Sequence, residues 1–191
     1  LMNINSEKKE ARQYWKAKRN DFYLGPNDSL KTDLIKNFFE LVGEVEDKII
    51  GGYYPIDSEI DCLEILNLCQ RSGAITSIPY INSKGLIDFR KWSHQEPLVN
   101  GAFNIPTSKN KDLVIPDIII IPLLSFDKLG TRLGMGSGIY DRSLPFYNIS
   151  LKIGLAFSGQ ISSKIPKTDY DHPLDAAVTE KKIYRFNEVL K

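Results

Sequence analysis

Two spacings of apolar residues divide the chain into helices and strands. Leu30, Leu34, Phe38 and Leu41 follow each other at intervals of three or four, which predicts a helix after the turn at residues 25–28. The same spacing predicts a helix over about residues 59–71, and Ser6 is a candidate N-cap for a first helix that runs to about residue 20. A short helix is expected over about residues 139–146.

Short apolar runs between these helices predict strands. They cover residues 48–54, 74–81, 85–92, 117–122 and 151–157, with further short candidates in the AAVT and KKIYRF segments near the C-terminus. The run at 117–122 (DIIIIP) is uniformly apolar, as expected for a central parallel strand that is covered on both faces. Strands that alternate with helices predict an α/β fold, a three-layer α/β/α sandwich around a mostly parallel central sheet. We expect residues 1–191 to form a single domain.

Composition excludes several classes of protein. The chain has 191 residues, of which 42% are hydrophobic, and 25 Lys+Arg against 24 Asp+Glu give a net charge of +1. Such a balance argues against a generally basic nucleic-acid binder. The longest apolar run, Ile118–Leu124, is far shorter than the roughly 20 residues that span a bilayer. The N-terminus is charged and has no apolar signal region, so we expect a cytoplasmic protein with no membrane partner.

The two cysteines are expected to be free, buried thiols. Cys62 and Cys69 are seven residues apart, which on a helix rising about 1.5 Å per residue is roughly 10 Å, too far for a disulfide. Together with His94 and His172 they show no zinc-site spacing. Free thiols also fit a reducing compartment.

The segment after the 117–122 strand carries the clearest candidate chemistry. Gly134, Gly136 and Gly138 alternate, so the backbone there can approach a ligand closely and turn its amides toward an anion. Arg132 precedes the glycines and can bind phosphate oxygens, while Asp141 follows them and can hold Mg²⁺. The pattern is neither a P-loop nor a dinucleotide fingerprint. Spacing alone leaves a second interpretation open, a tight strand-to-helix turn with an unrelated ion pair.

The residues around these glycines resemble a known family. Phe126-Asp127, Gly130 and RLGMGSGIYDR are similar to the signature of 5-formyltetrahydrofolate cyclo-ligases (5,10-methenyltetrahydrofolate synthetases). The resemblance continues in Lys8 and Arg12, in Ser58-Glu59-Ile60, in Phe103-Asn-Ile-Pro106 and in the segment from Asp171 to Glu180. It therefore covers nearly the whole chain, in the family's order.

The resemblance implies both a fold and an activity. The fold would be like that of NagB, RpiA and the CoA-transferases. The activity would be the ATP- and Mg²⁺-dependent cyclisation of 5-formyltetrahydrofolate to 5,10-methenyltetrahydrofolate, with release of ADP and phosphate after the formyl oxygen is phosphorylated. The partners would then be these two small molecules, with no nucleic acid, and the enzyme would act as a monomer.

The resemblance also implies roles for particular residues. Arg132, Tyr140 and Asp141 would be catalytic. Glu59, Phe103 and Tyr140 would bind the folate, although an aromatic packed beside Ile105-Pro106 is an equal interpretation for Phe103, and a core tyrosine remains open for Tyr140. Asp141 and Asp175 would bind Mg²⁺. ATP would be bound by Lys8, Arg12, Arg132, Gly134, Met135, Gly136, Ser137, Gly138, Ile139, Tyr140 and Asp141.

Three positions depart from the family pattern. Ser137 stands where Gly or Lys is usual, Ile139 replaces the first of two tyrosines, and Leu123 replaces a glycine after Pro122. Two alternatives therefore stay open. One is a non-catalytic nucleotide- or folate-binding relative with the same fold. The weaker one is a relative of sugar-phosphate isomerases or CoA-transferases, for which no nucleophilic glutamate is identified.

Overall fold

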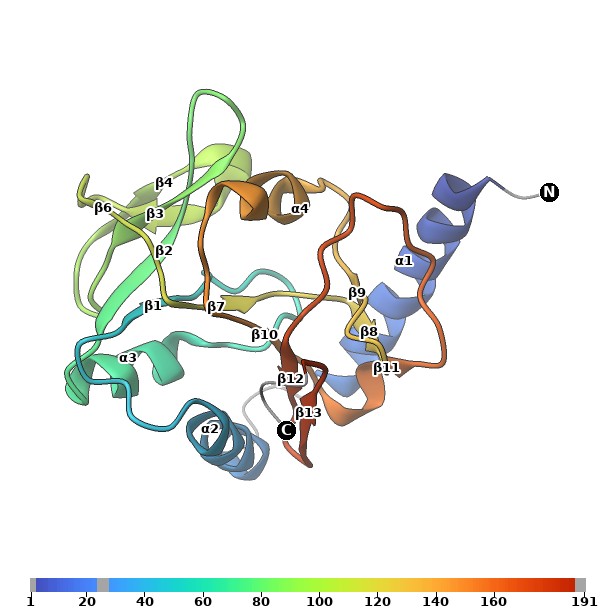
Figure 1. Cartoon of the computed structure of the whole chain (residues 1–191), viewed down its shortest axis with the longest axis horizontal. Coiled ribbons are helices and arrows are strands. Elements are labelled where there is room, and N and C mark those ends of the chain that lie inside the picture. Colours follow the sequence, from blue (N-terminus) through green and yellow to red (C-terminus); the bar gives the residue numbers. More distant parts are fainter. Residues whose placement is uncertain (1–2, 24–27, 188–191) are drawn as a thin grey trace.

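An eight-stranded sheet forms the centre of the computed structural model, which describes residues 3–23 and 28–187 (Figure 1). Its order is β13 (Ile183–Arg185), β12 (Ala176–Val178), β10 (Leu151–Leu155), β7 (Ile118–Ile121), β1 (Ile49–Gly51), β2 (Ile75–Ile81), β3 (Ile87–Lys91) and β6 (Leu113–Val114). The strands from β12 to β2 are parallel, whereas β13, β3 and β6 pair antiparallel at the two edges. The sheet confirms a mixed α/β fold with a mostly parallel sheet.

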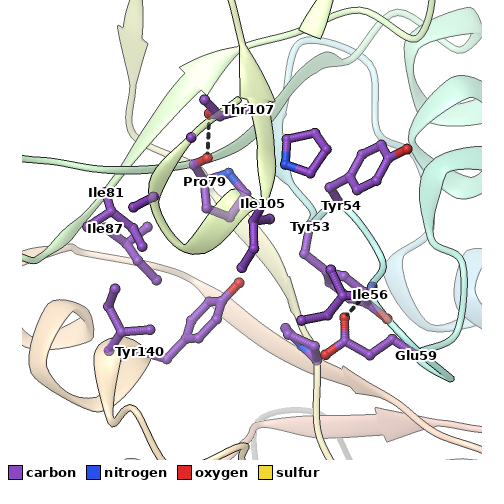
Figure 2. Close-up of a pocket in the computed structure, with 15 residues that line it drawn as sticks. Tyr53, Tyr54, Ile56, Glu59, Pro79, Ile81, Ile87, Ile105, Thr107 and Tyr140 are labelled. Atoms are coloured by element: carbon purple, nitrogen blue, oxygen red, sulfur yellow. Dashed lines mark hydrogen bonds between the residues drawn. The ribbon is translucent and has the colours of Figure 1, made fainter. Parts of the chain in front are cut away.

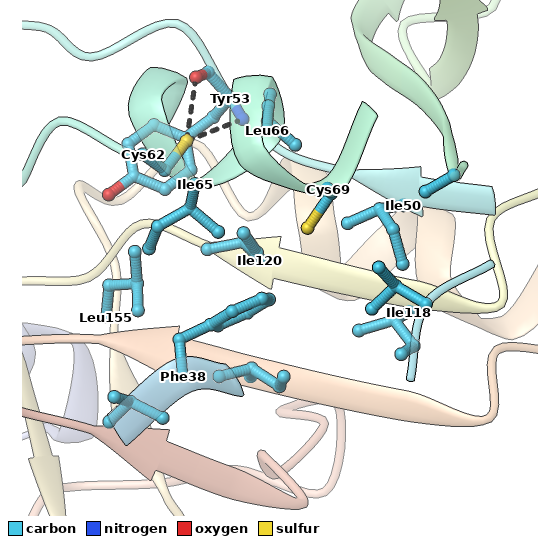
Figure 3. Packing of buried hydrophobic residues seen from close by; sticks show 14 of the residues in the cluster. Phe38, Ile50, Tyr53, Cys62, Ile65, Leu66, Cys69, Ile118, Ile120 and Leu155 are labelled. Atoms are coloured by element: carbon cyan, nitrogen blue, oxygen red, sulfur yellow. Dashed lines mark hydrogen bonds between the residues drawn. The ribbon is translucent and has the colours of Figure 1, made fainter. Parts of the chain in front are cut away.

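The central strand β7 is covered on both faces, which explains why all of its residues are apolar. All four of its isoleucines are buried. Ile118 and Ile120 join the core on one face, together with Phe38, Ile65 and other residues shown in Figure 3. Ile119 and Ile121 join the separate core on the opposite face. Because successive side chains of a strand point to opposite faces, a strand covered on both sides has no position for a polar residue.

Helices cover both faces of the sheet unequally (Figure 1). The helices α2 (Asp28–Val42) and α3 (Leu63–Arg71) pack on the first face. The short α4 (Ile139–Ser143) and the 3₁₀ turn η2 (Leu144–Phe146) lie on the second. The helix α1 (Ile4–Phe22) lies beside a small sheet of β11 (Ile161–Ser162), β8 (Ser125–Asp127) and β9 (Arg132–Leu133), next to η3 (Ser158–Gln160). A hairpin of β4 (Leu98–Asn100) and β5 (Pro106–Ser108) encloses the 3₁₀ turn η1 (Ala102–Asn104).

Several boundaries differ from the expected ones. The N-cap of α1 is Asn3, whose side chain accepts a hydrogen bond from Asn5 N, so Ser6 lies inside the helix. The helix α3 begins at Leu63 rather than at residue 59, because residues 52–62 form an irregular segment after β1. The expected helix over 139–146 is divided into α4 and η2. Of the turn expected at 25–28, residues 25–27 lie outside the described residues.

The cysteine prediction is confirmed. Cys62 and Cys69 are both free and buried. The Cys62 Sγ donates to Tyr53 O at 3.1 Å and accepts from Tyr53 N at 3.4 Å, which ties the start of α3 to the segment after β1 (Figure 3). Within the described ranges, no helix has both the length and the apolarity that crossing a bilayer requires.

Candidate active site

The glycine-rich loop connects β9 to α4. Gly136 and Gly138 have φ angles of +107° and +63°, which L-residues with a side chain rarely adopt, so glycine is required at both positions. Within the described part of the chain, no hydrogen bond is donated by the backbone N–H groups of residues 135–138. The loop is therefore an exposed turn with free amide donors, the arrangement that anion-binding loops use.

Arg132, on β9, is fixed at the base of this loop. Its Nη2 donates to Asp141 Oδ1 at 2.7 Å, and its Nη1 donates to the carbonyl of His172. The same Asp141 oxygen accepts from His172 N at 3.0 Å. The Arg132 side chain is 5% exposed and that of Asp141 is 25% exposed. The two residues predicted to flank a phosphate site are thus brought together across the loop, and a third segment joins them.

The helix α1 brings two cations to the same loop. Arg12 Nε donates to Gly134 O at 3.2 Å. Lys8, one turn earlier, lies with its Nζ 2.5 Å from Asp171 Oδ2, and Asp171 directly precedes His172. Burial alone would raise the pKa of Asp171, but hydrogen bonds from Lys8 and from the backbone of Thr168 hold that pKa below its usual value. Arg12 therefore contacts the glycine-rich loop itself, and Lys8 contacts the segment that binds Asp141 and Arg132.

Asp171 is a residue that the sequence analysis missed, and the contacts of Asp175 lie elsewhere. Asp175 precedes β12, and its Oδ2 accepts hydrogen bonds from both the Nζ and the backbone N of Lys152, each at 2.8 Å. No contact among the described residues joins it to Arg132 or Asp141. The metal-binding role of Asp175 stays a prediction. Asp171 and Asp175 lie only four residues apart in the same sequence motif. The sequence therefore does not show which of them lies at the glycine loop, whereas the ion pair with Lys8 places Asp171 there.

A mainly apolar pocket lies next to the glycine loop (Figure 2). Strands β2 and β3, the segment after β1, the β4–β5 hairpin and the start of α4 all contribute to it. The lining residues are Tyr53, Tyr54, Ile56, Glu59, Pro79, Ile81, Ile87, Gly101, Ala102, Ile105, Pro106, Thr107, Pro122, Ile139 and Tyr140. Pockets of this type, apolar with a few fixed polar groups, commonly hold small organic ligands.

Glu59 supplies the carboxylate of this pocket. It is 6% exposed, and its Oε2 accepts a hydrogen bond from Ile56 N at 3.0 Å. Its Oε1 lies 3.7 Å from Arg19 Nη1. Burial raises the pKa of Glu59, and the hydrogen bond from Ile56 and the charge of Arg19 oppose this effect. Because α3 begins only at Leu63, Glu59 lies in the irregular segment before the helix and not at a helix N-terminus.

Tyr140 connects the pocket to the glycine loop. It follows the loop directly and points its hydroxyl into the pocket (Figure 2). The next residue, Asp141, binds Arg132. Burial strongly raises the pKa of Tyr140, and the nearby Glu59 adds to this effect. The hydroxyl therefore stays protonated at neutral pH and can donate a hydrogen bond to a ligand.

Phe103 lies on the η1 turn, between Ala102 and Ile105, which line the pocket. It is 75% exposed and has a φ of +57°, an uncommon conformation for a residue with a bulky side chain. The interpretation of Phe103 as a packed aromatic is therefore wrong. Its role in stacking on a substrate stays a prediction.

The three departures from the family pattern fit the structure locally. Leu123 is 3% exposed and packs in the core of the second face, so its side chain is accommodated. Ser137 is not at a positive φ, and its carbonyl accepts from Arg142 Nη1 at 2.6 Å. Ile139 lines the pocket beside Tyr140. Neither Leu123 nor Ser137 occupies a conformation that only glycine can adopt.

Comparisons with known proteins give one consistent result. The model of the 5-formyltetrahydrofolate cyclo-ligase family matches residues 4–180. The cyclo-ligase of Escherichia coli K12 is 32% identical over 147 residues, covering 72% of this chain and 80% of that protein. The cyclo-ligase of Haemophilus influenzae is 32% identical over 143 residues, covering 70% of this chain and 76% of that protein.

Solved structures agree with the sequence comparisons. The 5,10-methenyltetrahydrofolate synthetase of Aquifex aeolicus has a TM-score of 0.80 and 29% identity, and covers 95% of this chain and 93% of its own. The synthetase of Mycoplasma pneumoniae, at 24% identity and a TM-score of 0.66, shares the fold. The resemblance noted in the sequence is therefore confirmed, and the chain belongs to the 5-formyltetrahydrofolate cyclo-ligase family, a family of enzymes.

Proposed function

We propose that this protein cyclises 5-formyltetrahydrofolate to 5,10-methenyltetrahydrofolate at the expense of ATP, releasing ADP and phosphate. One observation carries the proposal. Two consecutive residues connect the pocket to the glycine loop, because Tyr140 lines the pocket and Asp141 binds Arg132 at the loop. A phosphate group held by the loop would therefore lie beside a ligand in the pocket, as transfer between them requires.

ATP is proposed to bind through its phosphates at the loop. Arg132 offers a fixed guanidinium, Lys8 and Arg12 add two cations from α1, and the free amides of residues 135–138 provide neutral donors. The proposed ATP contacts extend from Gly134 through Met135 and Ser137 to Ile139, Tyr140 and Asp141. Positioning and charge neutralisation of this kind supply most of the catalysis in phosphoryl transfer.

The carboxylates at the loop fit a magnesium ion. Asp141 Oδ2 and Asp171 Oδ1 accept no hydrogen bond within the described residues, although the other oxygen of each carboxylate is engaged. No group of three or more metal-binding side chains occurs there. Mg²⁺ commonly binds through one or two carboxylates, with phosphates and water completing its shell. We infer that Asp141 and Asp171 would hold the ion, with Asp175 as a further predicted ligand, and that it would neutralise charge on the phosphates.

The pocket is proposed to hold the reduced folate. The Glu59 carboxylate can accept hydrogen bonds from the amino-pyrimidine edge of the pterin, and Tyr140 can donate to the substrate from the loop side. The formyl oxygen attacks the γ-phosphorus, and the bond to ADP breaks. The neighbouring amine then attacks the activated carbon and loses its proton, and phosphate leaves.

Some finer expectations remain part of this proposal. We propose that residues 1–191 act as one domain, as a monomer and in the cytoplasm, and that the sheet is related to those of NagB, RpiA and the CoA-transferases. Size-exclusion chromatography with light scattering tests the oligomeric state. The local fit of Leu123 and Ser137 supports an active enzyme over a binding module that has lost turnover.

A direct assay tests the activity. Purified protein is incubated with 5-formyltetrahydrofolate, ATP and Mg²⁺, and the absorbance of the methenyl product is followed. We expect product and ADP to form in equal amounts, and only when all three components are present. Tight binding of ATP without any product would instead favour the non-catalytic alternative.

A further inference from the structure

Arg19 is a buried cation on α1 that the proposed chemistry does not use. It is 1% exposed. Its Nε donates to Ser58 Oγ at 3.1 Å, and its Nη1 donates to Leu123 O at 3.3 Å. These bonds fix the guanidinium between α1, the segment after β1 and the residues that follow β7. Ser58 precedes Glu59, and Leu123 follows Pro122, so both anchors are next to residues that line the pocket.

Arg19 contacts Glu59 from behind the pocket. The distance of 3.7 Å between Arg19 Nη1 and Glu59 Oε1 is too long for a hydrogen bond but short enough for a strong charge interaction. Glu59 lines the pocket, whereas Arg19 does not. A close bidentate pair would use both carboxylate oxygens. Here Oε2 binds Ile56 N, and Oε1 remains available to a hydrogen-bond donor in the pocket.

The pairing of Arg19 is incomplete. Its Nη2 is buried and has no hydrogen-bond partner among the described residues. A buried charge with an unpaired donor destabilises a fold and is rarely kept for stability alone. An apolar residue of similar volume would satisfy packing at this place. The position of Arg19 behind the only carboxylate of the described pocket lining therefore suggests a role in the function of that carboxylate.

We propose that Arg19 is a positioning residue for the folate site, which keeps Glu59 ionised and turned toward the pterin. The inference rests on the proposed function, because it assigns Glu59 to the pterin. Arg19 itself does not touch the substrate. Its positive charge, 3.7 Å from Glu59 Oε1, stabilises the ionised carboxylate. The hydrogen bond from Ile56 N fixes the direction of that carboxylate.

Other ionisable groups also act on Glu59. Asp57 lies close enough to oppose its ionisation. The groups of Tyr53, Cys62 and Tyr140 are near enough for each to sense the charge of Glu59. Burial raises the pKa of all three of these groups, so they are neutral at physiological pH. Among these neighbours, Arg19 is the one that carries a positive charge.

Arg19→Met tests the proposal, with Arg19→Lys as the charge-preserving variant. For Arg19→Met we expect the KM for 5-formyltetrahydrofolate to rise by about 10- to 100-fold, and the KM for ATP to change by less than about 3-fold. The acidic limb of the folate kcat/KM profile should move to higher pH, since the loss of the cation favours protonated Glu59. Arg19→Lys should restore the position of that limb.

Lys18→Met is the matched control. Lys18 precedes Arg19 on the same helix, but its Nζ lies over the Tyr14 ring, 5.8 Å from the ring centroid, and Lys18 is not among the charges that act on Glu59. This variant should keep both KM values. A parallel rise of both KM values in folded Arg19→Met, or an acidic limb that does not move, would overturn the positioning role.

Ser58→Ala keeps the test decisive if Arg19→Met does not fold. Loss of the Ser58 anchor should raise the folate KM by about 3-fold and leave the ATP KM unchanged. An unchanged folate KM would overturn the proposal. Failure of the proposed function looks different, because the wild-type chain would then form no methenyl product. A wild-type chain that also shows no 5-formyltetrahydrofolate binding in a fluorescence titration would overturn both.

Discussion

Arg132 Nη2 and Asp141 Oδ1 lie 2.7 Å apart and join the two ends of the glycine-rich loop. The ion pair therefore fixes the path of the loop as well as the charge beside it. Because the Arg132 side chain is nearly fully buried, loss of its partner leaves a cation that water cannot solvate well.

Substitution of Asp141 separates these two contributions. Asp141→Asn keeps a hydrogen-bond acceptor for Arg132 but removes the charge, so we expect a smaller loss of Tm than for Asp141→Ala and a loss of turnover of at least about 100-fold. Asp141→Ala should lose turnover and, in addition, about 2 kcal/mol of stability. Initial rates measured against Mg²⁺ concentration check the metal role. Wild-type turnover by Asp141→Asn at ordinary Mg²⁺ would remove it.

Glu59→Gln tests the folate pocket. The amide keeps the size of the side chain but replaces one acceptor by a donor, which faces the pterin N–H groups unfavourably. We expect 5-formyltetrahydrofolate to bind about 10- to 100-fold more weakly, whereas ATP binding stays nearly unchanged. Separate calorimetric titrations with each ligand measure the two effects. Equal weakening of both would mean that Glu59 only supports the fold.

Gly136→Ala tests the shape of the loop. The φ of +107° is unfavourable for alanine, and the added Cβ would lie 3.2 Å from Arg12 Cζ. We expect a higher KM for ATP and an unchanged affinity for the folate. Gly43→Ala is the control, because Gly43 has a φ of +64° with open space around it, far along the chain from the loop. This variant should lose about 1 kcal/mol of unfolding free energy, and its Tm should fall accordingly, without a change in either KM.

The Lys8–Asp171 pair predicts a specific acid sensitivity. The pKa of Asp171 lies below its ordinary value of 3.8 in the folded protein, so its ionised form stabilises the fold above that pH. This contribution is lost as the pH falls below 3.8 toward the lowered pKa. The Tm of Asp171→Asn should therefore fall less steeply on acidification in that range than the Tm of the wild type.

Asp33→Asn controls for the loss of one surface carboxylate, because Asp33 is exposed on α2. Its Tm should follow the wild-type curve. Equal slopes for Asp171→Asn and the wild type in thermal melts from neutral pH down to the acidic range would contradict a stabilising ion pair with Lys8.

Local patterns were enough to predict the elements that cross the core. The four isoleucines of β7 indicated a strand covered on both faces, and the spacing in α2 indicated its buried side. Boundaries were less predictable where tertiary contacts decide them. The spacing of apolar residues predicts that α3 begins at about residue 59, whereas the helix begins at Leu63. The residues before it form an irregular segment, in which Cys62 bonds to Tyr53 and Glu59 lines the pocket.

By itself, the sequence determined the mixed α/β class, the glycine loop with Arg132 and Asp141, and the family, because each depends on residue order over short distances. Only the tertiary structure distinguished Asp171 from Asp175 at the loop and placed Arg19 behind Glu59. Both relationships join residues that are distant in the chain. Such contacts depend on how α1 packs against the sheet, and no local spacing of residues encodes that packing.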